Sequence, residues 1–392
     1  MMATPLSWLH TRRGQHCRTA WQLTTAAICW IALVIFYHEA GLAAAAEPTK
    51  YGIAYFLWHC LTKDYPVYDV SNYEAGLQAL GPVPQFHWWG KPAAGYYCLS
   101  DDDALLRQHA TALAQAGIDF VFVDFSNHDN LSYDRVAVEY LDPFSKMLTV
   151  WSQIPDAPKI VPFVQVTPRG DLYAEIVRRL QQYPNLAFIY MGKPLLLLVA
   201  NQAVPVDTAK RAELDTRFTA RLMWDDSSPQ GIWMFISRCQ PGFVESKGNI
   251  DCKQRVASNG GAVEQVSVSA AFQRDYMSDT ATAAPRYHGL TFLKQMARLD
   301  DLGPVPIVTI LGWNQWIAQR FCVRRDMSPD PACAPGSRAE ITGNPVFTDL
   351  FDEEYSTDFE PGGSMGDAYY QLLSCEVHRR KTGSLTPCRT PD

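Results

Sequence analysis

The chain has 392 residues and a formal net charge of −7, because 41 Asp and Glu outnumber 34 Lys and Arg. Proteins that bind nucleic acid carry a basic surface, so this balance argues against a polyanionic partner. Aromatic residues reach 12 % and include 11 Trp, which suits either a large aromatic core or a surface that stacks on sugar rings.

The first 46 residues have the pattern of a signal peptide. Three arginines precede an apolar run at residues 20–36, and four alanines then lead to Glu47. This order predicts cleavage after Ala46 and export to the periplasm or the exterior. Removing 46 of the 392 residues leaves a mature chain of 346, with no stable membrane insertion. The alternative is an uncleaved anchor, because the apolar run approaches the length that spans a bilayer.

Ten cysteines are present, and two of them, Cys17 and Cys29, belong to the predicted leader. An even set of eight in an exported chain predicts disulfides, although the sequence alone leaves their connectivity open. We expect neighbours to pair, as Cys60–Cys98, Cys239–Cys252, Cys322–Cys333 and Cys375–Cys388. Metal binding is the alternative, but CxxC and HxxxH spacings are missing from the sequence, so we predict no metal and no cofactor.

Short apolar runs recur along the chain, separated by helical patterns. In chain order they cover residues 51–58, 118–126, 159–167, 186–190 with 194–200, 232–237, 265–271 and 306–312. Most are continuously apolar, which is typical of parallel strands buried on both faces. Between the first two runs, Ser100 to Asp102 favour a helix start and Gly117 favours its end.

Repeated alternation of strand and helix predicts an α/β fold. We expect a (β/α)8 TIM-type barrel over residues 47–392, a single domain with long disulfide-stapled loops. A doubly wound sheet is the alternative, but the sequence has neither a GxGxxG fingerprint nor a Walker loop.

Active sites of such barrels gather at the carboxyl ends of the strands. The residues that follow the predicted strands, or lie in the loop after the first one, are imidazoles, amides, an arginine and aromatic rings. This mixture suits sugars, because rings cover the apolar face of a pyranose and amides bond its hydroxyls. The candidate substrate-binding residues are His59, His87, Trp88, Trp89, Tyr97, Asn127, Gln165, Asn314, Gln315, Trp316 and Arg320. His109 lies inside a predicted helix, so we expect a structural role for it.

Three segments carry a resemblance to a known group of enzymes. They read YGIAYFLW at residues 51–58, AGIDFVFVD at 116–124 and GWNQW at 312–316. These look like the strand motifs of glycoside hydrolase family 71/99-like barrels, a group of endo-α-mannosidases and α-1,3-glucanases. The FHWWG and GYY segments at residues 86–90 and 95–97 are more similar to uncharacterised exported relatives of that group. The resemblance implies a TIM-type barrel, a carbohydrate substrate and glycosidase activity.

The chain departs from the endo-α-mannosidase pattern after the last strand. That branch carries catalytic glutamates where this sequence has Gln315 and Ala318. Neither side chain can protonate a leaving group or act as a base. Two interpretations follow: the catalytic carboxylates lie elsewhere, or the protein binds glycans without cleaving them.

Asp124 is the first candidate for a relocated catalytic carboxylate. It ends an apolar strand, where a buried carboxyl group is expected to have a raised pKa. The acidic stretch at residues 352–360 is the second candidate and offers Glu354, Asp358 or Glu360. We predict that Asp124 pairs with Glu360 or Asp358 in acid/base chemistry. The alternatives are an Asp124 that only bonds loop amides and an acidic stretch that is only a solvated loop.

The predicted function is that of an exported glycoside hydrolase acting on an oligo- or polysaccharide. A non-catalytic glycan-binding protein on the same barrel is the second hypothesis. A metal-dependent esterase or deacetylase that uses Asp124, His59 and His87 is a third. The expected partner is a carbohydrate, and the sequence does not predict the oligomeric state.

Overall fold

The structure is a computed structural model. It describes residues 47–62, 66–82, 85–127, 132–168, 171–200, 206–224, 231–236, 253–271, 284–321, 346–347 and 353–391. Residues Pro48–Asp392 form one compact unit, and the description below concerns that unit. The predicted signal peptide and the cysteine pairs Cys239–Cys252 and Cys322–Cys333 lie outside the described residues.

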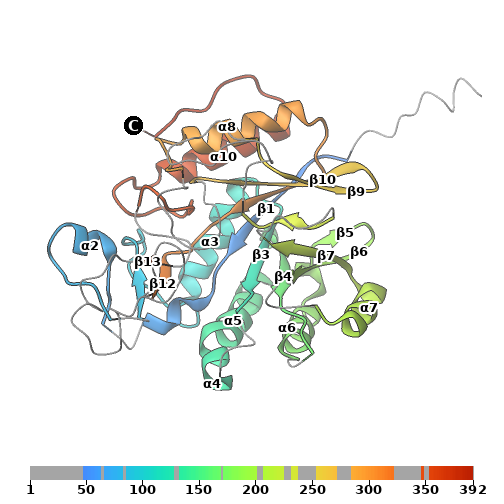
Figure 1. The fold of residues 1–392 in the computed structure, drawn as a ribbon, viewed down its shortest axis with the longest axis horizontal. Coiled ribbons are helices and arrows are strands. Elements are labelled where there is room, and N and C mark those ends of the chain that lie inside the picture. Colours follow the sequence, from blue (N-terminus) through green and yellow to red (C-terminus); the bar gives the residue numbers. More distant parts are fainter. Residues whose placement is uncertain are drawn as a thin grey trace, which may run out of the picture. The chain divides into compact units, whose positions relative to one another are not determined.

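Parallel strands lie side by side at the centre of this unit (Figure 1), and the sheet contains eight of them. Neighbours pair in the order β8-β7-β6-β4-β3-β1-β11-β10, so the last barrel strand in the chain lies beside the first. A doubly wound sheet would keep those two strands apart. The predicted (β/α)8 barrel is therefore confirmed. Its strands are β1 (Lys50–Tyr55), β3 (Phe120–Phe125), β4 (Lys159–Val164), β6 (Lys193–Val199), β7 (Thr219–Trp224), β8 (Trp233–Met234), β10 (Ala262–Ser269) and β11 (Ile307–Leu311).

The ring closes between β8 and β10 through side chains. Within the described part of the chain, no backbone ladder joins these two strands. Instead, the Gln265 amide accepts from the Met234 N–H and donates to the Met234 carbonyl, both at 2.9 Å. The Ser267 hydroxyl donates to the carbonyl of Phe235 at 3.0 Å. A primary amide carries both a donor and an acceptor, so Gln265 replaces the missing peptide partner.

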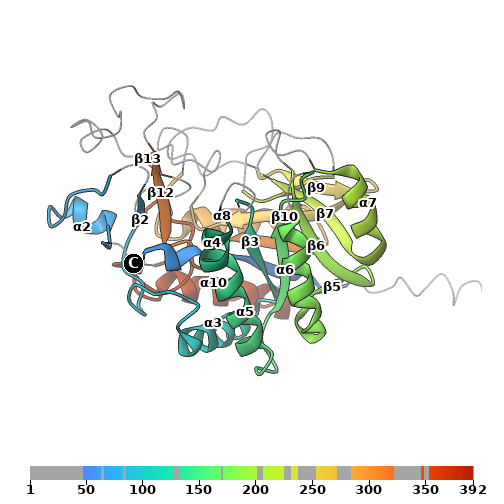
Figure 2. The ribbon, with the colours of Figure 1, turned by 90° about the horizontal axis from the view of Figure 1, so that it is seen from below.

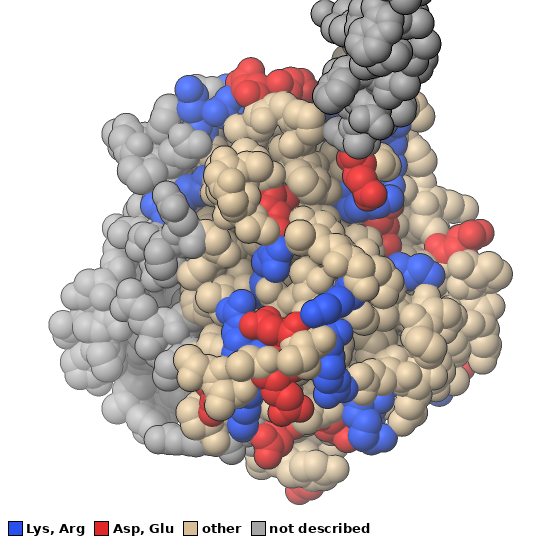
Figure 3. All heavy atoms as spheres, turned by 90° about the vertical axis from the view of Figure 1, so that its right-hand side faces the viewer, with Lys and Arg blue, Asp and Glu red and all other residues tan. Residues whose placement is uncertain are grey.

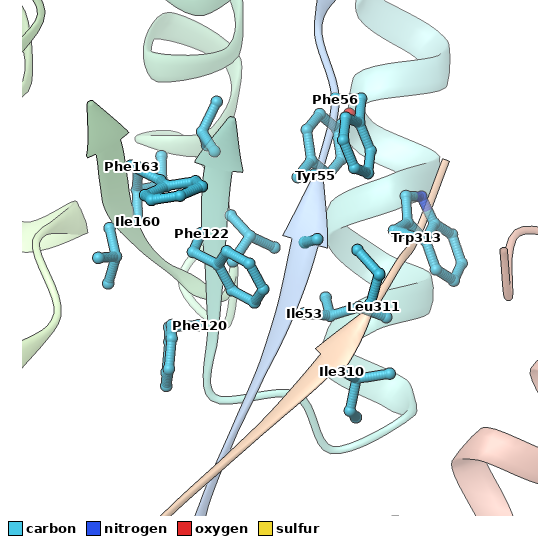
Figure 4. Close-up of a cluster of buried hydrophobic side chains, with 14 of the residues drawn as sticks. Ile53, Tyr55, Phe56, Phe120, Phe122, Ile160, Phe163, Ile310, Leu311 and Trp313 are labelled. Carbon is cyan, nitrogen blue, oxygen red and sulfur yellow. The ribbon is translucent and has the colours of Figure 1, made fainter. Parts of the chain in front are cut away.

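The interior of the barrel is aromatic. Phe122 and Phe163 each meet the ring of Phe235, at 6.2 and 5.3 Å, from two neighbouring strands (Figure 4). Because side chains alternate along a strand, the face of β3 that carries Phe122 also carries Asp124. Gly52 is required on β1, since a Cβ there would lie 2.2 Å from the ring of Phe120. The strand faces thus direct Asp124 toward the interior at the carboxyl end.

Helices follow most strands and cover the barrel in Figures 1 and 2. The Asp102 carboxylate, rather than Ser100, caps α3 by accepting from the Leu105 N–H at 2.8 Å. The larger helices are α3 (Asp103–Gln115), α5 (Asp142–Trp151), α6 (Leu172–Gln181), α7 (Thr208–Arg217), α8 (Leu290–Arg298) and α10 (Ala368–Thr382). Short elements are η1 (Trp58–Thr62), α2 (Val70–Glu74), α4 (Tyr133–Val136), the π-helix η3 (Ala137–Leu141), η4 (Pro184–Leu186), η5 (Leu299–Asp301), β5 (Ile189–Tyr190) and β9 (Val256–Asn259).

A second, three-stranded sheet lies on the side of the barrel that carries α2 (Figure 2). Its antiparallel strands are β2 (Phe86–Trp88), β12 (Ile317–Phe321) and β13 (Val346–Phe347). Ala318 pairs with His87 in this sheet. The pairing joins the loop after β1 to the chain after β11, so it builds one wall of the barrel mouth.

The helix α10 ties the end of the chain to the barrel. The Tyr370 hydroxyl donates to the Ala112 carbonyl at 3.1 Å, and His378 Nε2 donates to the Gln115 carbonyl at 2.7 Å. Both acceptors belong to the last turn of α3, so α10 packs against the carboxyl end of that helix. Within the described residues, no helix is long and apolar enough to cross a membrane, and the apolar run at 20–36 lies outside them.

Two of the predicted disulfides are confirmed, Cys60–Cys98 and Cys375–Cys388. The second closes the chain after α10 over a sequence separation of 13 residues.

We expect the double variant Cys375→Ser/Cys388→Ser to lose about 3 kcal/mol of stability, because a closed loop of this size limits the unfolded chain. Urea unfolding followed by circular dichroism measures this loss, and an unchanged midpoint would contradict it.

Candidate active site

Asp124 stands at the carboxyl end of β3 and is 3 % exposed. Its Oδ1 accepts from the Ser126 N–H at 2.7 Å. The Ser126 carbonyl in turn accepts from Nε2 of Gln165, which follows β4. Hydrogen bonds therefore connect the predicted acid and one predicted amide across two neighbouring strand ends. The candidate binding residue Asn127, which follows Ser126 in the chain, is exposed.

Two buried polar atoms that follow the strands flanking β3 lack hydrogen-bond partners in the described structure. They are Trp58 Nε1, after β1, and Gln165 Oε1, after β4. Their residues are 8 % and 3 % exposed. Buried polar atoms are nearly always bonded, so a free donor and a free acceptor beside a carboxylate are well placed for ligand hydroxyls. The Trp58 ring stacks on Phe56 at 5.6 Å, which fixes its position at the mouth.

The segment at residues 356–360 extends the barrel wall beside β11. The Gly312 N–H donates to the Thr357 carbonyl at 2.9 Å, and the Phe359 N–H donates to the Gly312 carbonyl at 3.1 Å. This is the alternating pattern of a parallel pair. The acidic stretch is thus partly built into the fold, and its solvated-loop interpretation does not describe Asp358 or Glu360, which are 1 % and 8 % exposed.

The carboxyl group of Asp358 is enclosed. Its Oδ2 accepts from Trp89 Nε1 at 2.9 Å and its Oδ1 accepts from the Gln315 N–H at 2.5 Å. Burial raises the pKa of Asp358 from 3.8 to about 7, while the bonds from Trp89 and Gln315 and the charge of Arg286 oppose this rise. Near neutral pH a large fraction of Asp358 therefore carries its proton.

Asp358 and Asp124 lie on either side of Phe56. A Cβ built on Gly312 would stand 3.1 Å from the Phe56 ring and 3.8 Å from Asp358 Oδ1, so both groups share that face of Gly312. Phe56 continues β1, whose other neighbour is β3, the strand that carries Asp124. The two acids thus belong to β3 and to the segment that pairs beside β11, with β1 and β11 between them.

Glu360 is the centre of a buried hydrogen-bond network. Its Oε2 accepts from the Tyr97 hydroxyl at 2.8 Å and from Trp316 Nε1, and its Oε1 accepts from His109 Nε2 at 2.8 Å. The Tyr55 hydroxyl and His109 Nδ1 share a hydrogen bond at 2.7 Å, so both ring nitrogens of His109 are engaged. His109 has the expected structural role, but as a direct partner of a candidate catalytic acid.

The predicted stacking residues Trp89 and Trp316 form a pair with each other. Their rings stack at 4.3 Å with 13° between the planes, and they are 3 % and 0 % exposed. Trp89 bonds Asp358 and Trp316 bonds Glu360, so the indole pair bridges the two acids. Both rings belong to the wall of the site rather than to an open platform.

His59 and Asn314 hold the backbone at the mouth. The Asn314 amide accepts from the Phe56 N–H at 2.8 Å and donates to the Phe56 carbonyl at 3.0 Å. His59 Nε2 donates to the Asn314 carbonyl at 2.7 Å, and burial lowers the pKa of His59 to about 4. Both residues bond backbone groups, and their sugar-binding roles stay predictions.

His87, Trp88 and Arg320 belong to the small sheet. His87 Nε2 accepts from the Gly81 N–H at 2.9 Å, and its Nδ1 donates to the Gln85 carbonyl at 3.0 Å. Burial lowers the pKa of His87 to about 4. Arg320 donates to the Gly81 carbonyl at 2.6 Å, and Trp88 is completely buried. Both ring nitrogens of His87 are engaged by backbone, so its sugar-binding role stays a prediction that this conformation does not support.

The described residues do not form a metal site. They contain no group of three His, Cys, Asp or Glu side chains placed to hold a metal ion. A cavity of about 800 Å³ opens at the amino ends of β1 and β11, at the opposite end of the barrel. Its cations are paired, as Arg380 with Asp300 and Arg379 with Glu376. Figure 3 looks at the right-hand side of Figure 1, and there Lys and Arg lie beside Asp and Glu.

Sequence reasoning did not name Trp58 as a site residue, and it did not predict the contact between His109 and a candidate acid. Trp58 precedes His59 at the end of the first strand, but only the fold shows that its indole N–H has no hydrogen-bond partner. His109 occupies a buried position of α3 together with Leu106, Ala110 and Leu113. A histidine among apolar residues on one helix face was the available signal. Glu354, the third acid of the stretch, accepts from the Tyr287 N–H at 2.9 Å, away from the indole pair.

Comparison with known proteins returned solved structures only. No protein-family model matches the sequence, and no curated protein matches it. The GH99 endo-alpha-mannosidase from Bacteroides thetaiotaomicron is 14 % identical, with a TM-score of 0.46 over 86 % of this chain and 98 % of that chain. Its complex with BIS-TRIS-propane is 12 % identical, with the same TM-score over 85 % and 97 %. The barrel assignment rests on the strand order rather than on these distant similarities.

Proposed function

We propose that the protein is a glycoside hydrolase whose general acid is Asp358 and whose second carboxylate is Asp124. The observation that carries this proposal is the buried Asp358 carboxyl group with a pKa raised to about 7. A general acid works best when its pKa lies near the working pH. Asp124 accepts a backbone N–H, a bond that stabilises its charged form, so the pair combines a proton donor with a carboxylate.

We propose that cleavage inverts the anomeric centre. β1 and β11 lie between β3 and the segment that carries Asp358, so the two acids come from strands that are not neighbours. A separation of about 6.5–9.5 Å leaves room for a water between acid and base. In this mechanism Asp358 protonates the departing oxygen while Asp124 activates the water. Trp58 Nε1 and Gln165 Oε1 bind hydroxyls of the sugar beside Asp124.

The proposed substrate is an oligo- or polysaccharide outside the cytoplasm. The leader pattern and the two disulfides support export. The strand motifs that resemble family 71/99-like barrels point to α-linked mannans and glucans among the glycans to test. After cleavage at Ala46 the protein would be released to the periplasm or the exterior.

A reducing-end release assay on the chain starting at Glu47 tests this function against α- and β-linked mannans and glucans. We expect turnover, with inversion visible by proton NMR of the first anomer formed. Asp124→Asn should lower kcat/KM by about 10²–10⁴-fold, since the amide cannot take the proton from water. Asp300→Asn, at the opposite end of the barrel, is the matched control and should leave turnover unchanged.

A second candidate function is glycan binding without turnover. It is favoured by Glu360, whose two oxygens are occupied by three protein donors, and by the absence of a carboxylate at Gln315 and Ala318. Retained binding with no turnover on any glycan, for both the native protein and Asp124→Asn, would select it over hydrolysis.

A further inference from the structure

Arg286 is a buried cation beside the proposed acid. It precedes α8 and is 3 % exposed. Its guanidinium lies over the ring of Tyr369 at 4.2 Å and over the ring of Trp89 at 5.4 Å. Trp89 is the residue whose indole N–H bonds Asp358, so Arg286 and Asp358 share a neighbour.

Arg286 also holds the backbone of the acidic segment at two points. Its Nε donates to the Ser356 carbonyl at 2.7 Å, and its Nη2 donates to the Asp358 carbonyl at 2.8 Å. Its own N–H donates to the Glu354 carbonyl at 2.8 Å. Three bonds from one residue thus fix the chain at the acid and at two residues before it. A planar guanidinium can direct two N–H groups in fixed directions, which an ammonium group cannot do.

Among the described residues, the charges that act most strongly on Arg286 and Asp358, apart from each other, are acidic. Asp358, Glu353 and Glu354 act on the arginine, and Tyr369 faces it from α10. On the other side, Asp358 meets Trp89, the Gln315 N–H, Ser356 and the charge of Glu360. The hydrogen bonds of Arg286 go to carbonyls, so its charge acts on the carboxyl group of Asp358 without a direct ion pair.

We propose that Arg286 is a positioning residue for Asp358, which it serves by clamping the backbone at Ser356 and Asp358 and by placing a positive charge behind the carboxyl group. The chemical part of this inference rests on the proposed function, because it assigns Arg286 to the acid of that reaction. The charge stabilises the ionised form of Asp358 and so keeps the acid able to lose its proton. The clamp keeps the carboxyl group directed past Gly312 toward the mouth.

The indole N–H of Trp89 provides a direct measurement. It bonds Asp358 Oδ2, so its ¹⁵N–¹H resonance should shift as Asp358 titrates; Trp89→Phe assigns the signal. In Arg286→Met the inflection should move upward by about one pH unit, because an opposite charge is removed from near the carboxyl. In Arg286→Lys the inflection should stay close to the native one, while kcat falls at least tenfold with little change in KM.

Arg221→Met is the control, since it removes an arginine that bonds Glu264 near the amino ends of β7 and β10. It should leave the Trp89 titration unchanged. An inflection at the native pH in Arg286→Met would overturn the electrostatic part of the proposal. Native kcat in Arg286→Lys would overturn the clamp. If Arg286→Met does not fold, the Arg286→Lys variant tests the proposal in its place. The Trp89 titration needs no substrate, so a failed hydrolase assignment is distinguishable from a failed role for Arg286.

Discussion

Asp358→Asn is expected to lower kcat/KM for glycan hydrolysis by about 10²–10⁴-fold. The amide is nearly isosteric, but it cannot donate a proton to the departing oxygen. Substrates with an activated leaving group, such as aryl glycosides, need little protonation and should lose much less activity. That difference separates a missing acid from a damaged fold. A uniform loss on both kinds of substrate would argue against Asp358 as the acid.

Asp358 also determines how the activity of the native protein is expected to fall at alkaline pH. Burial raises the pKa of Asp358 to about 7, so the rate should fall as pH rises through about 7, where the acid loses its proton. Asp358→Asn should not show this fall in its residual activity.

The pH dependence of the stability also has a defined sign. Since the folded pKa lies above the usual 3.8, the contribution of Asp358 to stability is complete below pH about 4 and is lost as pH rises to about 7.

Glu360→Ala is expected to have the largest effect on stability, about 3–5 kcal/mol. The substitution leaves three buried donors without their acceptor, on Tyr97, Trp316 and His109. Removing one partner of a buried network costs the desolvation of those that remain. Urea unfolding at neutral pH, followed by tryptophan fluorescence and circular dichroism, measures the difference.

Two further variants locate the origin of that loss. Glu213→Ala removes a carboxylate that is 71 % exposed on α7, and it should change stability by less than about 0.5 kcal/mol. Glu360→Gln keeps one carbonyl acceptor and should fall between the two. If Glu360→Ala unfolds at the native urea concentration, the network is not a source of stability and Glu360 is free for another role.

The barrel could be predicted from the sequence because its signal is local. Each strand is a short apolar run bounded by polar or turn residues, and the run at 118–126 contains all of β3. The closure between β8 and β10 could not be predicted in this way. It depends on Gln265 reaching Met234, and nothing in either local pattern indicates that a side chain replaces a backbone ladder.

The sequence predicted which residues belong to the candidate site better than it predicted their contacts with one another. Asp358 and Glu360 were expected near the mouth, and their burial came from a long-range pairing of residues 356–360 with Gly312 that local periodicity does not reveal. Trp89 and Trp316 were expected to face a sugar. Their mutual stacking and the bond from Trp89 to Asp358 depend on contacts between residues more than 200 positions apart. The pairing of Asp124 with Asp358 stays a prediction.

The pairing of the first barrel strand with the last has a consequence for how the protein is made. Lys50 lies opposite Ile307, 257 residues later in the chain, and Asp358 comes later still. Such distant contacts form slowly, because a long loop must close before they contribute any stability. During synthesis, β1 therefore waits without its β11 partner until most of the chain has left the ribosome. The acids of the mouth come together last, so an incomplete chain carries no assembled site.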